Sequence, residues 1–142
     1  MPKILSCYDV SPMDSCGFAV QGETVQEVME HGGMHSTSRH GLKDEDATPE
    51  MMSVVRSRVR EVPARVPPPF PVVPRATPSL VCCSEAGGEE CVFAVQSDEP
   101  EELIEQLRDH VVAQHGEADE GRILERLIMA RGRIRASGGM VR

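Results

Sequence analysis

Phe18-Ala19-Val20-Gln21 decides how the chain is organised, because it returns 75 positions later as Phe93-Ala94-Val95-Gln96. The same shift relates two cysteines and two histidines in each half of the chain: Cys7 with Cys82, Cys16 with Cys91, His35 with His110 and His40 with His115. The alignment needs no gap. Two copies are too few for a solenoid, so the pattern predicts a tandem duplication of one small domain.

The predicted boundaries are residues 1–62 for the first repeat, 63–77 for a proline-rich linker and 78–142 for the second repeat. Neither a helix nor a central strand can run through so many prolines. A polyproline II segment rises about 3.1 Å per residue, so we expect a stiff spacer that holds the repeats apart by up to roughly 40 Å. Each repeat has about sixty residues, near the lower limit for folding on apolar burial alone.

Each repeat is predicted to contain two extended segments that form a hairpin, followed by two helices. In the first repeat these are Lys3 to Val10, Cys16 to Gln21, a helix from Thr24 to about His40, and a helix from Pro49 to about Val62. Thr24-x-x-Glu27 and Asp98-x-x-Glu101 have the pattern of a capping box at a helix start, and Thr48 before Pro49 is a cap followed by proline at the first helical position. The fold class is therefore α+β, with two small ββαα domains, each stapled by a metal, joined by the linker.

Composition and charge exclude several classes of function. The formal net charge of −8 disfavours nucleic-acid binding, because both repeats are acidic and would repel a phosphate backbone. We find neither a signal peptide nor an apolar stretch long enough to span a bilayer, so we expect a protein of the reducing cytoplasm without a membrane partner. There the five cysteines suit a metal better than disulfides.

Each repeat spells Cys-x8-Cys-x18-His-x4-His. Zinc prefers four tetrahedral sulfur and nitrogen ligands, often one pair from a hairpin and one from a helix. The pattern predicts two Zn²⁺ ions per chain, with these ligands: Cys7, Cys16, His35 and His40 in one site and Cys82, Cys91, His110 and His115 in the other. Disulfides Cys7–Cys16 and Cys82–Cys91 are the alternative, but they leave the paired histidines without a role.

Two further side chains, His31 and Cys83, are alternative candidates for the ligand sets. His31 lies four residues before His35, yet the second copy has Gln106 at that position, which favours His35 with His40. Cys83 is adjacent to Cys82, and the 75-residue shift matches it to Tyr8, so the register leaves Cys83 spare.

Each copy resembles the prokaryotic small metal-binding protein family, a domain of unknown function. The resemblance rests on Cys16-Gly17-Phe18-Ala19-Val20, on the acidic start of the following helix, and on the closing His35-x4-His40-Gly41, with the corresponding stretches of the second copy. It implies metal binding and a compact α+β fold, and it implies no reaction.

The favoured function is a binding module that meets a protein partner through acidic helical faces. Four protein ligands leave no metal position for water, so we expect no enzyme. The alternative is a thiol-based redox or metal-responsive switch. Gly32 and Gly33 weaken the first histidine helix, which predicts lower metal affinity at the first site.

Overall fold

The structure, a computed structural model, describes residues 1–11, 15–64, 68–88 and 90–137. Its elements, in chain order, are β1 (Lys3–Ser6), α1 (Cys7–Val10), β2 (Ala19–Gly22), α2 (Val25–His40), η2 (Asp44–Asp46), α3 (Pro49–Ser57), β3 (Arg60–Glu61), β4 (Ser79–Cys82), η3 (Cys83–Glu85), β5 (Ala94–Ser97), α4 (Pro100–Gln114), α5 (Glu120–Arg131) and β6 (Arg135–Ala136). We call residues 1–62 the N-terminal half and residues 78–142 the C-terminal half.

Both halves contribute to a single antiparallel sheet with the strand order β3-β1-β2-β5-β4-β6. They meet at its centre, where β2 pairs with β5 and Val20 lies opposite Val95. Because Val20 and Val95 occupy the same place in the two copies, an approximate two-fold axis passes through this pair. The predicted α+β class is confirmed, whereas the expectation that the linker keeps the halves apart is wrong.

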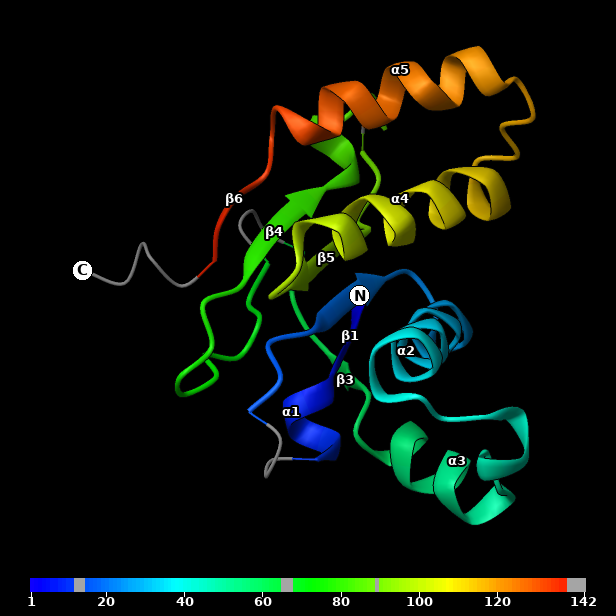
Figure 1. Cartoon of the computed structure of the whole chain (residues 1–142), viewed down its shortest axis with the longest axis vertical. Coiled ribbons are helices and arrows are strands. Elements are labelled where there is room, and N and C mark those ends of the chain that lie inside the picture. The colour runs from blue at the N-terminus through cyan, green and yellow to red at the C-terminus, as the bar shows by residue number, and fades with distance from the viewer. Residues whose placement is uncertain (12–14, 65–67, 89, 138–142) are drawn as a thin grey trace.

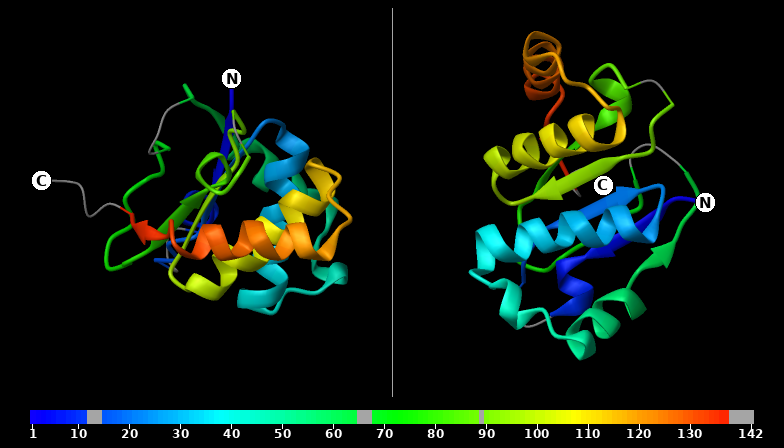
Figure 2. Two further views of the ribbon diagram at one scale, coloured as in Figure 1. Left: turned by 90° about the horizontal axis from the view of Figure 1, so that it is seen from above. Right: turned by 90° about the vertical axis from the view of Figure 1, so that its right-hand side faces the viewer.

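The helices cover one face of the sheet. Figure 1 shows α2 and α4 next to each other over the strands, with α3 beyond α2 and α5 beyond α4, and Figure 2 shows the same order from the side. A single hydrophobic core combines both halves: Phe18, Val20 and Val28 from one with Phe93, Val95, Leu103, Leu107 and Val111 from the other. The two helix pairs therefore stabilise one shared core. No helix among the described residues is long and apolar enough to cross a membrane.

The described part of the linker packs on the opposite face of the sheet. Successive residues of a strand point to opposite faces, so Leu80, Cys82 and Ala94 face away from the helices. Phe70 packs against these three side chains, and Val73 is buried as well. The proline-rich segment is thus a cover for apolar strand residues. Residues 65–67 of the linker lie outside the described part of the chain.

Short edge strands replace the ends of the predicted second helices. We expected the helix that begins at Pro49 to continue to about Val62, but α3 ends at Ser57 and Arg60–Glu61 pairs with β1 as β3. The C-terminal half repeats this arrangement, with β6 pairing to β4. Arg135 lies in β6 and forms an ion pair of 2.8 Å with Glu85.

Helix caps agree with the sequence at two of three starts. Thr24 Oγ1 accepts a hydrogen bond from the backbone N–H of Glu27, and Thr48 Oγ1 accepts one from Met51. Asp98, expected to cap α4, instead accepts a hydrogen bond from Gly17 N–H in the other half, and Glu99 is the N-cap residue. Asp98 therefore links the two halves instead of capping α4.

Because Val20 is fully buried at the centre of the sheet, Val20→Ala should destabilise the whole chain by about 2 kcal/mol. In this variant, the protection of backbone amides from hydrogen exchange should fall by the same amount in β1 and in β4. Val54→Ala on the exposed side of α3 is the control and should change stability by about 0.5 kcal/mol or less. Loss of protection confined to the N-terminal half would contradict a shared core.

Candidate metal centre

A helical turn directly after the first strand of each half positions the first cysteine of each cluster. Cys7 is the first residue of α1, and Cys83 is the first residue of η3. The backbone N–H of Cys7 donates to the carbonyl of Phe18 at 3.0 Å, and that of Cys83 donates to Phe93 at 2.9 Å. These equivalent bonds close the strand pairs and bring both thiols to the helix-covered side of the sheet.

Cys83, rather than the predicted Cys82, joins the second cluster. Cys82 is the last residue of β4 and pairs with Ala94, just as Ser6 pairs with Ala19, so Cys82 corresponds to Ser6. Strand alternation turns its side chain toward the linker, where its Sγ lies 3.8 Å from Arg135 Nη2.

The alignment without a gap is therefore wrong by one residue before the second cysteine. Eight residues separate Cys7 from Cys16, and seven separate Cys83 from Cys91. A signal for this was present, since Ile4-Leu5-Ser6-Cys7 and Leu80-Val81-Cys82-Cys83 share two apolar residues, a small residue and a cysteine.

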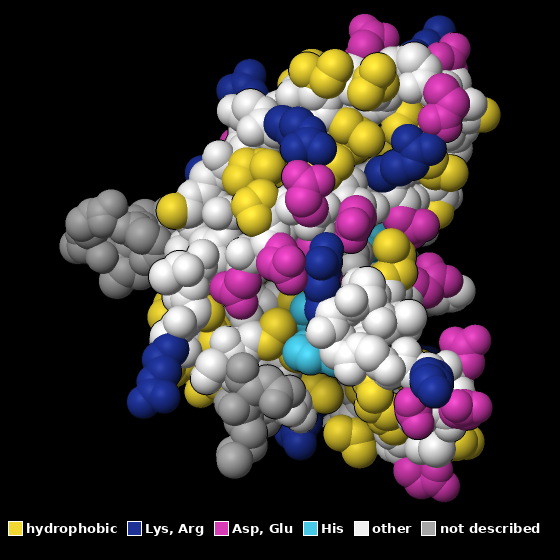
Figure 3. Space-filling model, viewed as in Figure 1, with side chains coloured by type: hydrophobic (Ala, Val, Ile, Leu, Met, Phe, Trp, Pro, Cys, Tyr) yellow, Lys and Arg dark blue, Asp and Glu magenta, His cyan; other side chains and the backbone are white. Residues whose placement is uncertain are grey.

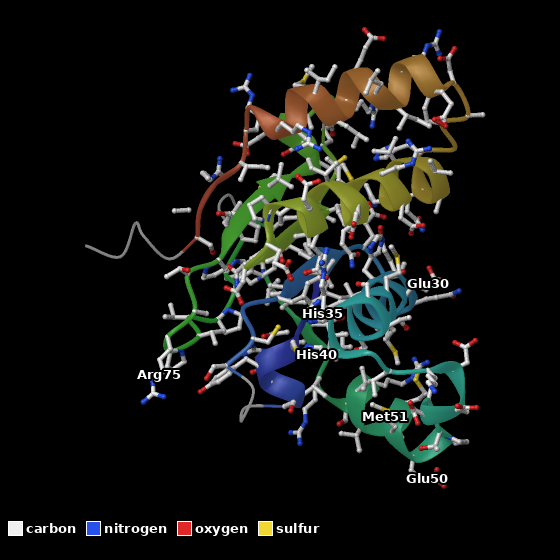
Figure 4. The ribbon with its side chains drawn as sticks, in the orientation of Figure 1. Glu30, His35, His40, Glu50, Met51 and Arg75 are labelled. Atoms are coloured by element: carbon white, nitrogen blue, oxygen red, sulfur yellow. The ribbon has the colours of Figure 1, made fainter. Side chains whose placement is uncertain are left out.

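The first cluster brings together all four predicted residues, Cys7, Cys16, His35 and His40, with one donor atom of each within 4.8 Å of the others. Figure 4 shows His35 and His40 side by side near α1. Three separations are 3.6 Å from Cys7 Sγ to His40 Nε2, 3.3 Å from Cys16 Sγ to His35 Nε2, and 3.1 Å between the two Nε2 atoms.

The second cluster consists of Cys83, Cys91, His110 and His115 and has nearly the same dimensions. Cys83 Sγ lies 3.5 Å from His115 Nε2, and Cys91 Sγ lies 3.2 Å from His110 Nε2. Tetrahedral zinc with its usual bond lengths places nitrogen and sulfur about 3.6 Å apart and two nitrogens about 3.4 Å apart. Each of the two donor sets therefore fits a tetrahedral ion of its own.

In each cluster one cysteine is a thiolate, and the side chains around it hold protons that a metal ion would displace. A hydrogen bond from the Cys7 thiol lowers the pKa of Cys16 to about 3, and one from Cys83 lowers the pKa of Cys91 to about 3. Burial disfavours a charged His35, but hydrogen bonds to Cys16 and Glu102 outweigh it and raise the pKa of His35 to about 9. A bound cation would take the place of the protons that these pairs share.

A carboxylate from the opposite half holds the inner histidine of each cluster. His35 Nδ1 lies 2.6 Å from Glu102 Oε2, and His110 Nδ1 lies 2.6 Å from Glu27 Oε2. Both carboxylates are almost fully buried, with exposed fractions of 4% for Glu27 and 2% for Glu102. Such a contact fixes the orientation of the imidazole and leaves Nε2 free to face the cysteine.

Stacked rings complete the support of these two histidines. The Phe18 ring stacks on His35 with centroids 4.0 Å apart, and the Phe93 ring stacks on His110 at 3.9 Å. Sequence analysis missed the roles of Glu27 and Glu102. Their signal was a glutamate at the same position of both copies, but Glu27 was explained by helix capping, and Glu101 rather than Glu102 was assigned to the second cap.

His31 lies outside the first cysteine and histidine cluster, in agreement with the choice of His35 and His40. It is buried near the approximate two-fold axis, where it faces its counterpart Gln106. Gln106 Nε2 also donates to the carbonyl of His31 at 3.2 Å. His31, Glu27 and His110 come close enough to form a third group, but the partners of these side chains make that group part of the contact between the helices.

The metal content of two variants can test whether Cys83, rather than Cys82, belongs to the second cluster. Cys83→Ser should reduce the metal bound per chain by the share of one site, because Cys83 is the residue in the cluster. Cys82→Ser should leave the content unchanged and is the matched control. Elemental analysis of both proteins, purified without an affinity metal, decides the matter. Loss of metal in Cys82→Ser alone would restore the original register.

The carboxylate contact predicts an effect across the halves. Glu102→Gln should weaken metal binding at Cys7, Cys16, His35 and His40 by about tenfold or more, because the carboxylate no longer orients His35. Cobalt titration followed by thiolate charge-transfer absorption would measure the affinity. Glu101→Gln is the control, since Glu101 pairs with Arg131 at the exposed surface. Equal affinities in the two variants would contradict the proposed support.

Comparison with known proteins gave two negative results and one match. No curated protein and no solved structure matches the chain. Residues 2–61, which contain β1 to β3 and the whole first cluster, match a family model. The family is described as Protein of unknown function (DUF1059), and the N-terminal half of the chain is similar to it.

Proposed function

We propose that the protein is a small zinc-binding protein with two structural Cys2His2 sites. The observation that carries this proposal is the pair of clusters in which two sulfurs and two imidazole nitrogens converge at separations suited to one tetrahedral ion. In each cluster these donors come from three separate places: the end of the first strand, the segment before the second strand, and the end of the long helix. A bound ion would therefore tie the helix layer to the sheet.

The two sites are proposed to descend from one metal-binding unit by tandem duplication. The equivalent pairs Val20 with Val95, Glu27 with Glu102 and Phe18 with Phe93 support this history, because each pair has the same role in both halves. The resemblance of each copy to small metal-binding proteins of prokaryotes points in the same direction.

Binding rather than catalysis suits these sites. Four protein donors fill a tetrahedral ion and leave no position for water or substrate, so no reaction is proposed. The proposed partner is another protein of the reducing cytoplasm. Leu124 and Ile128 support this because they lie one turn apart on α5 and are 58% and 61% exposed. On the face shown in Figure 3, basic and acidic side chains are intermixed, and nucleic acid is not the proposed partner.

A redox switch is the second candidate, favoured by the low pKa of Cys16 and Cys91 beside a second thiol. Two thiolates, one hydrogen peroxide and two protons would give one disulfide and two waters. The disulfide removes two of the four ligands, so the ion would leave.

Metal analysis tests both candidates. The chain purified without an affinity metal should contain about two zinc ions, and a chelator should lower its thermal midpoint because metal binding contributes to folding. Gly32 and Gly33 favour release from the first site before the second. Metal-free protein with unchanged circular dichroism and thermal midpoint would overturn the proposal.

The same protein treated with hydrogen peroxide separates the two candidates. A structural site should keep its zinc until the protein unfolds, whereas a switch should release zinc as Cys7–Cys16 and Cys83–Cys91 disulfides form. Mass spectrometry of the cysteines would identify these pairs.

A further inference from the structure

An apolar cavity of about 260 Å³ lies between α2 and α3 in the N-terminal half. Its lining is mostly aliphatic and thioether side chains: Leu5, Val10, Met29, Met51, Met52 and Val55. Cys7, Phe18 and His35 also line it, so it borders the first metal cluster. Figure 4 shows Met51 on α3, below His35 and His40 in the view.

Missing side chains on α2 explain the cavity. Gly32 and Gly33 stand where α4 carries Leu107 and Arg108, and Leu107 is fully buried in the C-terminal half. The second helices differ in the same way. In α5, Ile123, Leu127 and Ala130 are buried, whereas none of the residues from Pro49 to Ser57 in α3 is buried. The C-terminal half therefore fills with side chains the space that the N-terminal half leaves open.

The polarity of the lining indicates the chemistry of an occupant. Apolar side chains dominate the lining, and the polar residues Ser36, Thr37, Lys43 and Asp44 join them from the end of α2 and the segment that follows. A cavity of about 150 Å³ in another protein binds benzene, so this volume suits a molecule of roughly ten heavy atoms. Three methionines adapt easily in shape and make favourable sulfur contacts with aromatic rings.

We infer that the N-terminal half binds a small uncharged aromatic molecule in this cavity, beside the first metal cluster. This activity goes beyond metal binding and belongs to one half only. The ring lies among Met29, Met51 and Phe18, and a polar substituent reaches Ser36 or Thr37. The cluster and the cavity share Cys7 and His35, so the bound molecule contacts two residues of the donor set.

Indole and naphthalene are suitable probes, with the full chain labelled at its methionine methyl groups for NMR. Both compounds should shift the Met29 and Met51 signals saturably and leave Met129, on α5, unchanged. Absence of a saturable shift, or an equal shift at Met129, would overturn the inference. The measurement reads binding in the cavity, so its outcome is independent of how many zinc ions the chain holds.

Two filling variants and one control make the test specific. Gly32→Leu installs the side chain found at Leu107, with Leu5 yielding at the tip of its side chain, and Val55→Phe fills the cavity from α3. Each should weaken indole binding by about tenfold or more while the protein stays folded. Val54→Ala, on the exposed side of α3 and outside the lining, should keep the affinity within about twofold. Unchanged affinity in both filling variants would place the probe elsewhere and overturn the inference.

Discussion

The contact between a buried carboxylate of one half and a buried imidazole of the other is the interaction on which the rest of the structure depends. Glu27 and Glu102 lie in the interior, where an unpaired charge would be very costly. Each is tolerated because it meets His110 or His35 at 2.6 Å. The contact requires α2 and α4 to be neighbours over one sheet. The same contact therefore packs the two halves together and orients the inner histidine of each cluster.

Local features of the fold could be predicted from the sequence. Short segments rich in apolar residues and parted by turn residues indicated the paired strands, and Thr24 and Thr48 marked two helix starts correctly. The four residues of the first cluster followed from the spacing of cysteine and histidine. These features are encoded within short stretches of chain, where residue type and backbone preference act directly.

Contacts between the halves could not be predicted in the same way. Phe18-Ala19-Val20-Gln21 and its copy revealed the repeat, but nothing in either stretch states that the two strands pair with each other. A sheet edge accepts any suitable strand, and the choice depends on how the two helix pairs pack over the sheet. The prediction of Cys82 as a member of the second cluster failed for a different reason. Two cysteines are adjacent, and the alignment without a gap selected Cys82, whose side chain points to the face of the sheet away from the helices.

His31 and Gln106 show what is gained by joining two related units in one chain. In an isologous dimer of identical chains, both positions beside the axis must carry the same residue. A covalent link removes that restriction, so an imidazole can meet an amide at a place where symmetry would impose histidine against histidine or glutamine against glutamine. The link also makes association independent of protein concentration. A substitution in one half then leaves the equivalent residue of the other half unchanged, so the two halves can specialise separately.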